Sequence, residues 1–340
     1  MDRDGIAKLA QDCFQECPTI VLGSGASMHH GLPSMDMLSN YIRTNMKTED
    51  ESEETAWKQV NRALENDNHL ETALEKQNLP HSLLSKIIRL TWQCINEKDK
   101  VVLETAISCH VAFPLGELLS GIFRSTQIEV HIVTTNYDRV AEYACNSRGI
   151  LFQTGFAPGY VQKWEGTEHV NFSHRRKKCR VVKIWKVHGS LDWFQTENEK
   201  IVGLPLFERP SADYTPLIVT PGPYKFQKTH DDPFRSIING ADKALKNAAA
   251  FLCVGYGFRD QHIHPKIYDR CREKNIPIIV LAKKLTQEAR DFLKQRAGTN
   301  YMGIELASGG SKIYLPQNTD GLNVNDSELW SLSGFNKLVL

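Results

Sequence analysis

The sequence predicts an α/β fold in which helices cover both faces of a mostly parallel β-sheet. Short apolar runs, such as TIVL at 19–22 and NIPIIVLA at 275–282, are typical of strands buried on both faces. Segments in which apolar residues recur at helical spacing lie between these runs. Glycines or polar residues follow several runs directly, as they do where the strands of an open sheet end. Together these observations predict a doubly wound, Rossmann-like sheet.

The first elements follow from local patterns. The N-terminal stretch MDRDGIAKLAQDCFQECP mixes charges of both signs and lacks the apolar middle of a signal peptide. We expect it to form a short first helix. A strand at 19–22 follows. A glycine turn then leads into a helix that we expect to run past Leu38 to about Arg43. The acidic stretch KTEDESEET predicts a solvated connection.

Residues 46–124 predict a helical insertion between two strands of the sheet. Apolar residues from Leu83 to Ile95 recur at helical spacing, and so do those from Leu103 to Ile107. Pro114 is typical of the first turn of a further helix. Strand signals are almost lacking here, so the segment adds helices to the sheet without adding strands.

Strands and helices alternate in the second half of the chain. The run IEVHIVTTN predicts a strand ending at Asn136, with a helix from Asp138. The runs RVVKIWKVHGS, PLIVTPG and NAAAFLCVGYGF predict further strands, with one helix at about 232–246 and another from Ile263. We therefore expect residues 1–45 and 125–310 to form one domain and residues 311–340 to form a C-terminal extension.

Composition narrows the possible partners. The 340 residues include 41 Lys and Arg against 40 Asp and Glu, a formal net charge of +1. Such a balance does not attract the whole chain to nucleic acid or to an anionic membrane. No run reaches the ~20 apolar residues of a membrane span, and we expect a cytoplasmic protein. The eight cysteines are too sparse for a disulfide scaffold, and only Cys13 and Cys17 lie close together. We expect neither a zinc ribbon nor another metal site.

Four strand ends carry the polar residues and glycines that bear on function. They read GSGAS after 19–22, TTNYD at 134–138, HGS at 188–190 and GYGFRDQHI at 255–263. Ligands of an open α/β sheet bind outside the carboxyl ends of its strands. Because parallel strands end at the same edge of the sheet, we expect these four segments to form one site.

The glycine loop predicts a phosphate or pyrophosphate site. Gly23 and Gly25 permit a tight turn and close approach of the backbone to a ligand, and Ser27 adds a hydroxyl near a helix N-terminus. A dehydrogenase fingerprint would place glycine where Met28 stands and an acid at the end of a second strand, and this chain has neither. A dinucleotide fits, a conventional dehydrogenase does not, and a plain strand-to-helix turn is the alternative.

Three side chains at the other strand ends are candidates for chemistry. Asn136 could bind a ribose hydroxyl or a water, although it and Asp138 are also suited to cap the following helix. His188 at a strand end beside Gly189 could take a proton at neutral pH, although a lone histidine is more often structural. Asp260 is expected to cap a helix.

In this order, the motifs GSGAS, TTNYD, KVHGS and GYGF resemble those of the sirtuin family, and specifically its bacterial sirtuin-like branch. The stretch GLPS after the first loop is also similar to that branch, and the resemblance spans roughly residues 17–282. It implies a sirtuin-like NAD-binding catalytic domain. In that branch the family hydrolyses NAD+ to nicotinamide and ADP-ribose in defence against phage, where NAD+ depletion halts the infected cell.

The resemblance assigns roles to residues at the four strand ends. Asn136 and His188 would be catalytic, with NAD+ as the substrate and no metal. The residues that would contact NAD+ are Gly23, Ser24, Gly25, Ala26, Ser27, Thr135, Asp138, Gly189, Gly255, Tyr256 and Gly257.

Departures from the family leave other functions open. Sirtuins that deacylate proteins carry a four-cysteine zinc module after the catalytic histidine, and Asp-Phe-Arg where this chain has Ser34, Met35 and Asp36. An NAD-dependent deacylase without the module, or a non-catalytic sensor of NAD or ADP-ribose, are the alternatives. We also expect a homo-oligomer that is restrained until a signal arrives. The resemblance implies a partner such as a HerA-type ATPase or an Argonaute-like protein, to which nucleic-acid sensing is delegated.

Overall fold

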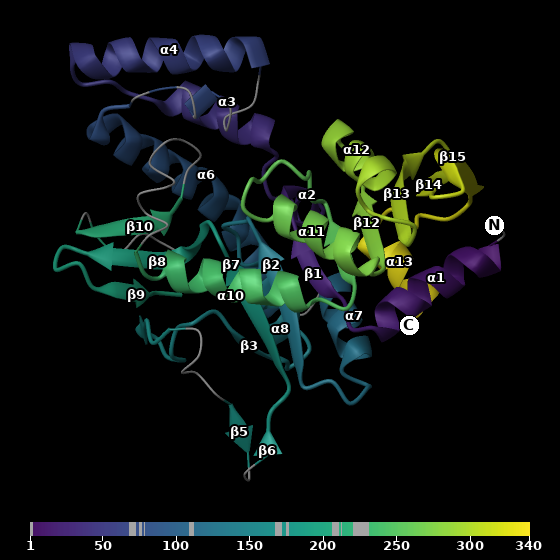
Figure 1. Ribbon diagram of the computed structural model, residues 1–340. Helices are drawn as coiled ribbons and strands as arrows, with labels where there is room; N and C mark the ends of the chain where they lie inside the picture. The colour runs from purple at the N-terminus through teal and green to yellow at the C-terminus, as the bar shows by residue number, and fades with distance from the viewer. Residues whose placement is uncertain are drawn as a thin grey trace.

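The computed structural model describes residues 3–67, 73–74, 77, 79–108, 112–166, 172–174, 177–205, 211, 213–219 and 231–340. A nine-stranded sheet in the order β15-β14-β13-β12-β11-β1-β2-β7-β3 forms its centre (Figure 1). The strands from β13 to β3 in this order are parallel, and β14 and β15 continue the sheet antiparallel. The strand bounds are β1 Thr19–Leu22, β2 Glu129–Thr134, β3 Leu151–Gln153, β7 Val181–Lys186, β11 Phe251–Val254, β12 Ile278–Ala282, β13 Tyr301–Ala307, β14 Gly310–Leu315 and β15 Asn318–Asn325.

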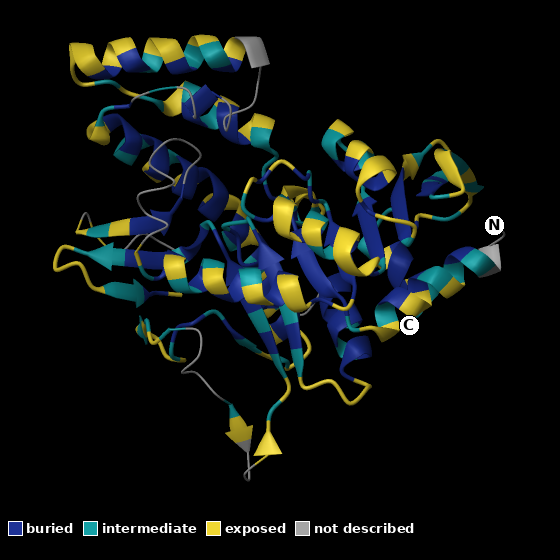
Figure 2. Cartoon of the chain, in the orientation of Figure 1, coloured by how far each residue is buried: buried dark blue, intermediate teal, exposed yellow. Residues whose placement is uncertain are grey.

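Helices cover both faces of this sheet, which confirms the predicted doubly wound α/β class. Side chains alternate along β1, so Ile20 and Leu22 join the core under α1, α7, α8 and α13, whereas Val21 joins the core under α10, α11 and α12. Burial is concentrated in the sheet and the inner helix faces (Figure 2). The helix bounds are α1 Arg3–Gln15, α2 Ser24–Met28, α3 Met35–Asn45, α4 Glu51–Asp67, α6 His81–Ile107, α7 Pro114–Ile122, α8 Val140–Asn146, α10 Phe234–Asn247, α11 His264–Lys274, α12 Gln287–Gln295 and α13 Leu332–Val339.

The strand order places a switch point at β1. The chain passes from β1 to β2 on one side and later returns to β11 on the other. Helices on opposite faces diverge at such a point and leave a crevice at the carboxyl ends of the strands. The ends of β1, β2, β7 and β11 lie along this edge, and they carry the four segments singled out in the sequence.

Three predicted elements differ from the structure. The helix expected after the glycine turn is two helices, because α2 ends at Met28 and Ser34 caps α3 by accepting from the amide of Met37. The acidic stretch expected as a connection already contains the start of α4 at Glu51. The strand ending at Asn136 stops at Thr134, since the next residues turn toward the glycine loop.

The run PLIVTPG does not join the central sheet, which corrects the prediction. Residues 216–218 of this run lie in β10 (Tyr214–Ile218), which pairs antiparallel with β8 (Gly189–Thr196). The four-stranded sheet has the order β10-β8-β9-β4, with β9 at Ile201–Gly203 and β4 at Gln162–Lys163. Strands β5 (Ser173–His174) and β6 (Lys177–Lys178) form a separate pair.

Two groups of helices lie at opposite ends of the molecule. In Figure 1 the helices α3, α4 and α6 lie together at one end of the molecule. At the other end, α13 packs on α1 and α7, and Asn336 donates to the carbonyl of Pro114 at 2.8 Å. Among the described residues, no helix has the length and apolar character needed to cross a membrane.

Candidate functional site

The glycine loop after β1 packs backbone against backbone on the turn after β11. The amide of Gly23 donates to the carbonyl of Val254 at 3.1 Å, and that of Gly25 donates to Gly255 at 3.2 Å. A Cβ on Gly23 would lie 2.4 Å from the Gly255 oxygen, and one on Gly255 would lie 2.2 Å from the amide nitrogen of Ala26. Three glycines are therefore required by the contact of two strand ends, before any ligand is considered.

Asn136 ties the end of β2 to the same loop. Its Nδ2 donates to the carbonyl of Gly23 at 2.9 Å and to Oγ of Ser27 at 3.1 Å. Its own amide donates to Oγ1 of Thr134 at 3.0 Å. Thr135 beside it is half-buried. The side chain is thus held at the mouth of the glycine loop by two hydrogen bonds and does not cap α8.

Asp138 is buried and serves the protein's own structure. Its Oδ1 accepts from the amide of Val140 at 3.1 Å, so it caps the start of α8. Burial raises the pKa of Asp138, while the nearby charge of Lys186 acts in the opposite direction. The Lys186 ammonium donates to the Asp138 carbonyl and, at 2.9 Å, to Oε1 of Glu142. Asp138 also bonds to the side chain of Ser27, so it lies beside the glycine loop while it holds the start of α8.

His188 follows β7 and lies beside a carboxylate. Its Nε2 is 3.0 Å from Oδ2 of Asp260, in a pair that is almost wholly buried, although the two are not aligned as a hydrogen bond. The next residue, Gly189, has φ +89°, and a Cβ there would lie 2.0 Å from the carbonyl oxygen of Leu217. The backbone thus turns sharply at the point that presents the imidazole.

Asp260 has a second role that sequence reasoning missed. Its Oδ1 accepts from the amides of His262 at 2.9 Å and Ile263 at 3.0 Å, as expected of a helix cap. Its Oδ2 faces His188, and nothing in the local sequence indicates that pairing, since 72 positions separate the two residues. A charge that develops on the imidazole is stabilised by this carboxylate.

Two backbone contacts join the Asn136 and His188 segments. The amide of Val187 donates to the carbonyl of Thr134 at 3.1 Å, and that of Leu191 donates to the carbonyl of Tyr137 at 3.0 Å.

The other predicted contact residues lie in the two loops. Tyr256 is buried against Phe258, whereas Gly257 has room for a Cβ and its carbonyl accepts from Oγ1 of Thr286 at 2.8 Å. The loop residues Ser24 and Ala26 lie in the short helix α2.

The histidine at the start of α11 belongs to an aromatic cluster. The His264 ring packs edge-on against Phe258 and Phe292, and burial lowers its pKa. Within the described ranges, no three His, Cys, Asp or Glu side chains gather as metal ligands. The cysteines that the structure describes are free thiols. The absence of a metal remains a prediction.

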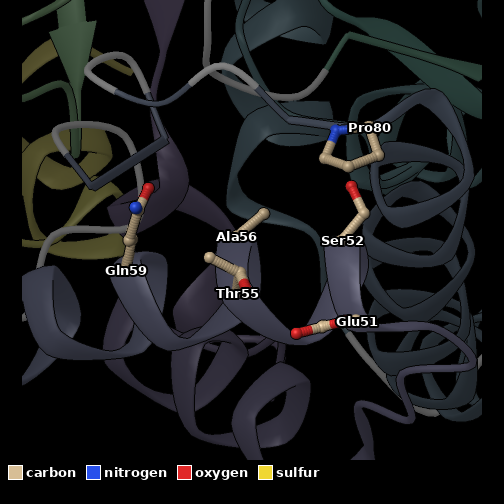
Figure 3. A pocket seen from close by; sticks show the side chains of 6 residues that line it. All are labelled: Glu51, Ser52, Thr55, Ala56, Gln59 and Pro80. Atoms are coloured by element: carbon tan, nitrogen blue, oxygen red, sulfur yellow. The ribbon is translucent and has the colours of Figure 1, made fainter.

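A shallow hollow of about 490 Å³ lies elsewhere, on the surface of α4. Glu51, Ser52, Thr55 and Gln59 line it from one helix, with Pro80 opposite (Figure 3). A second hollow lies between α3 and α4. Both hollows are lined by residues of α3, α4 and the chain before α6, and neither is lined by residues of the four strand ends.

His30 gives the loop region a dependence on pH. Its ring stacks on Phe113, and burial, together with the charge of His29, lowers its pKa from 6.5 to about 4. The folded chain holds His30 neutral while the unfolded chain protonates, so stability should fall as pH drops from 6.5 toward 4. We expect a loss on the order of 1–2 kcal/mol after allowance for solvent screening. The melting temperature should therefore depend less on pH across this range for His30→Gln than for the wild-type chain. The same pH dependence in both chains would contradict the assignment.

Known proteins add one finding about this site. Residues 130–298 match the SIR2-like domain. The SIR2-like segment contains Asn136, His188 and the turn at Gly255, and the glycine loop precedes it. The match covers 169 of the 340 residues, just under half of the chain. No curated protein sequence matches the chain.

Solved Sir2 structures are similar to the chain at low identity. One from work on the mechanism and regulation of Sir2 enzymes is 13% identical, covers 99% of this chain and 97% of its own, and has a TM-score of 0.47. An ADP-ribose complex of a Sir2 homologue mutant is 11% identical, covers 99% and 96%, and also has a TM-score of 0.47. An NAD complex of a Sir2 homologue is 12% identical, covers 84% of each chain and has a TM-score of 0.42.

Proposed function

We propose that the chain is an NAD+ glycohydrolase that cleaves NAD+ to nicotinamide and ADP-ribose, and that it acts in bacterial antiphage defence by depleting NAD+. The observation that carries the proposal is the arrangement at one edge of the sheet. There Asn136 is bonded to the glycine loop, and His188 is paired with Asp260. All three side chains lie in the segment that matches the SIR2-like domain, and the glycine loop precedes it. The antiphage role rests on the resemblance of the motifs alone.

The residues suggest a division of labour. Backbone amides of the glycine loop at 23–27 would face the pyrophosphate of NAD+. Asn136 can donate and accept at once, which suits a ribose hydroxyl or the attacking water. His188 would act as the general base, and the Asp260 carboxylate would stabilise the imidazolium that results. Asp138 is already engaged by α8 and is not needed in this scheme.

The reaction balances without a further reactant. The bond between the anomeric carbon of the ribose and the nicotinamide nitrogen breaks, and its electron pair neutralises the cationic ring as it leaves. A water oxygen bonds to the same carbon and gives its proton to His188, which later releases it to solvent. The transition state resembles an oxocarbenium ion, as in other glycosyl transfers, so no acid is required for the leaving group.

Hydrolysis is favoured over protein deacylation by the sequence between the motifs. Between His188 and Gly255 the chain has a single cysteine, Cys253, so the four-cysteine module of deacylating sirtuins has no counterpart there. Cys253 is itself buried in β11. A homo-oligomer and a HerA-type or Argonaute-like partner are part of the same proposal, with the helical insertion at 46–124, called the helical segment below, as the contact surface.

The test is to incubate the purified chain with NAD+ and to follow products by chromatography. We expect nicotinamide and ADP-ribose in equal amounts, without need of an acyl peptide. A parallel reaction contains an acetyl-lysine peptide. Formation of deacetylated peptide coupled to NAD+ use would replace the hydrolase with a deacylase, and tight NAD+ binding without products would make the chain a sensor.

A further inference from the structure

Helix α6 sends two buried polar side chains toward the candidate site from the helical segment. Trp92 and Asp99 are seven residues apart, or about two turns, and therefore lie on the same face of the helix. Trp92 is 5% exposed and Asp99 is 0% exposed. Each bonds to a segment that follows one of the two proposed catalytic strand ends.

Asp99 binds the start of α8 with both of its carboxylate oxygens. Oδ1 accepts from the amide of Arg139 at 2.9 Å, and Oδ2 accepts from Nε and Nη2 of the same residue at 2.9 and 2.6 Å. The hydroxyl of Tyr143 also donates to Oδ2, at 2.6 Å. A buried carboxylate that accepts four hydrogen bonds, three of them from one residue, fixes the orientation of Arg139 closely.

Arg139 is the residue directly after the TTNYD segment. It is three positions beyond Asn136, and its amide is one of those left without a partner inside α8. A shift of this residue would therefore move the turn that aims the Asn136 side chain at the glycine loop. The backbone contact of Asp99 is the link between the helical segment and that turn.

Trp92 makes the corresponding contact on the His188 side. Its indole Nε1 donates to the carbonyl of Leu191 at 2.7 Å. The amide of Leu191 in turn donates to Tyr137, beside Asn136. One face of α6 is thus bonded to the chain on both sides of the site.

We propose that Asp99 is a positioning residue for NAD+ cleavage, which holds the 136–139 turn so that Asn136 meets the substrate in a productive orientation. The inference rests on the proposed function. Stability alone is a weak reason for the pair, because buried ion pairs often stabilise no better than apolar residues of the same size. A fixed backbone at a strand end that carries a catalytic amide is a stronger reason.

The experiment compares Asp99→Asn and Asp99→Ala with Glu53→Gln. Glu53 is a buried carboxylate of the same helical segment that bonds to Lys86 at 2.7 Å and to the amide of Glu49 at 2.8 Å. Its hydrogen-bond and ion-pair partners lie within that segment, so it controls for loss of a buried charge. All chains are assayed well below their melting temperatures, with the folded fraction set by circular dichroism.

For Asp99→Asn we expect kcat to fall about tenfold or more, with the KM for NAD+ changed less than about threefold. Asp99→Ala should lose more, because it also removes the acceptor for the Arg139 amide. Glu53→Gln should keep kcat within about twofold. Hydrogen exchange, read by mass spectrometry, should rise in peptides spanning 134–143 for the Asp99 variants and not for Glu53→Gln.

Two outcomes would overturn the inference. One is a kcat of Asp99→Asn that equals that of Glu53→Gln at the same folded fraction, and the other is unchanged hydrogen exchange at 134–143. A wild-type chain that leaves NAD+ intact would instead refute the proposed function. In that case the exchange measurement still decides whether Asp99 holds the turn.

Discussion

Replacing His188 with alanine is expected to lower the rate of NAD+ cleavage at least ~100-fold, because the attacking water loses its base. Asn136→Ala should cause a loss of similar size, since the Asn136 amide bonds to both Gly23 and Ser27 of the glycine loop and would no longer meet the ribose or the water. The measurement is the initial rate of nicotinamide release at saturating NAD+.

Folding must be followed separately for the two variants. His188 is almost wholly buried, so its truncation leaves a cavity and removes the imidazole that faces the Asp260 carboxylate, and a lower melting temperature is expected. Asn136→Ala removes bonds to Gly23 and Ser27 and is expected to lower the melting temperature as well. His131→Ala is the control, because that histidine lies earlier in β2, beside Trp185. Near-normal hydrolysis by folded His188→Ala would remove His188 from the mechanism.

The parts of the fold that local pattern determines could be predicted from the sequence. The runs at 19–22, 251–254 and 278–282 are continuously apolar because both faces of these strands are covered, and each forms a parallel strand. The polar segments after the strands were located for the same reason, since strand ends are where buried runs stop. Their gathering at one edge follows from parallel pairing.

The remaining features depend on contacts between distant parts of the chain. An apolar run does not distinguish a central parallel strand from an antiparallel one, and β10 pairs with β8 in a second sheet. The pairs His188–Asp260 and Asp99–Arg139 join residues 72 and 40 positions apart. One long-range pair does have a sequence signal. Lys186 stands inside the apolar run KIWKV, and a buried lysine requires a partner of opposite charge, which Glu142 supplies.

The glycines of the site show how a motif can be located correctly and explained differently by the structure. The sequence suggested that Gly23 and Gly25 allow close approach of a ligand. The structure places Gly255 against them, so each glycine makes room for the other loop. A phosphate could still face the amides of the loop, but the geometry of that loop depends on this backbone contact.

Gly255→Ala is therefore expected to cause a large loss of stability. Its φ of +57° is unfavourable for alanine, and the new Cβ would lie 2.2 Å from the Ala26 nitrogen and 2.3 Å from the Gly25 carbonyl carbon. Left-handed backbone and overpacking together should lower the free energy of unfolding by about 3 kcal/mol or more. The measurement is the urea midpoint, read by circular dichroism.

Gly257→Ala is the matched control for this prediction, two residues along the same turn. A Cβ at Gly257 meets only the Thr286 methyl group, at the ordinary contact distance of 3.5 Å. Its loss of stability should stay below about 1 kcal/mol. Equal urea midpoints for the two variants would show that the glycine loop and the turn after β11 do not depend on their close contact. A selective loss in Gly255→Ala would show that the two strand ends form one packed unit, on which the position of Asn136 depends through its bond to Gly23.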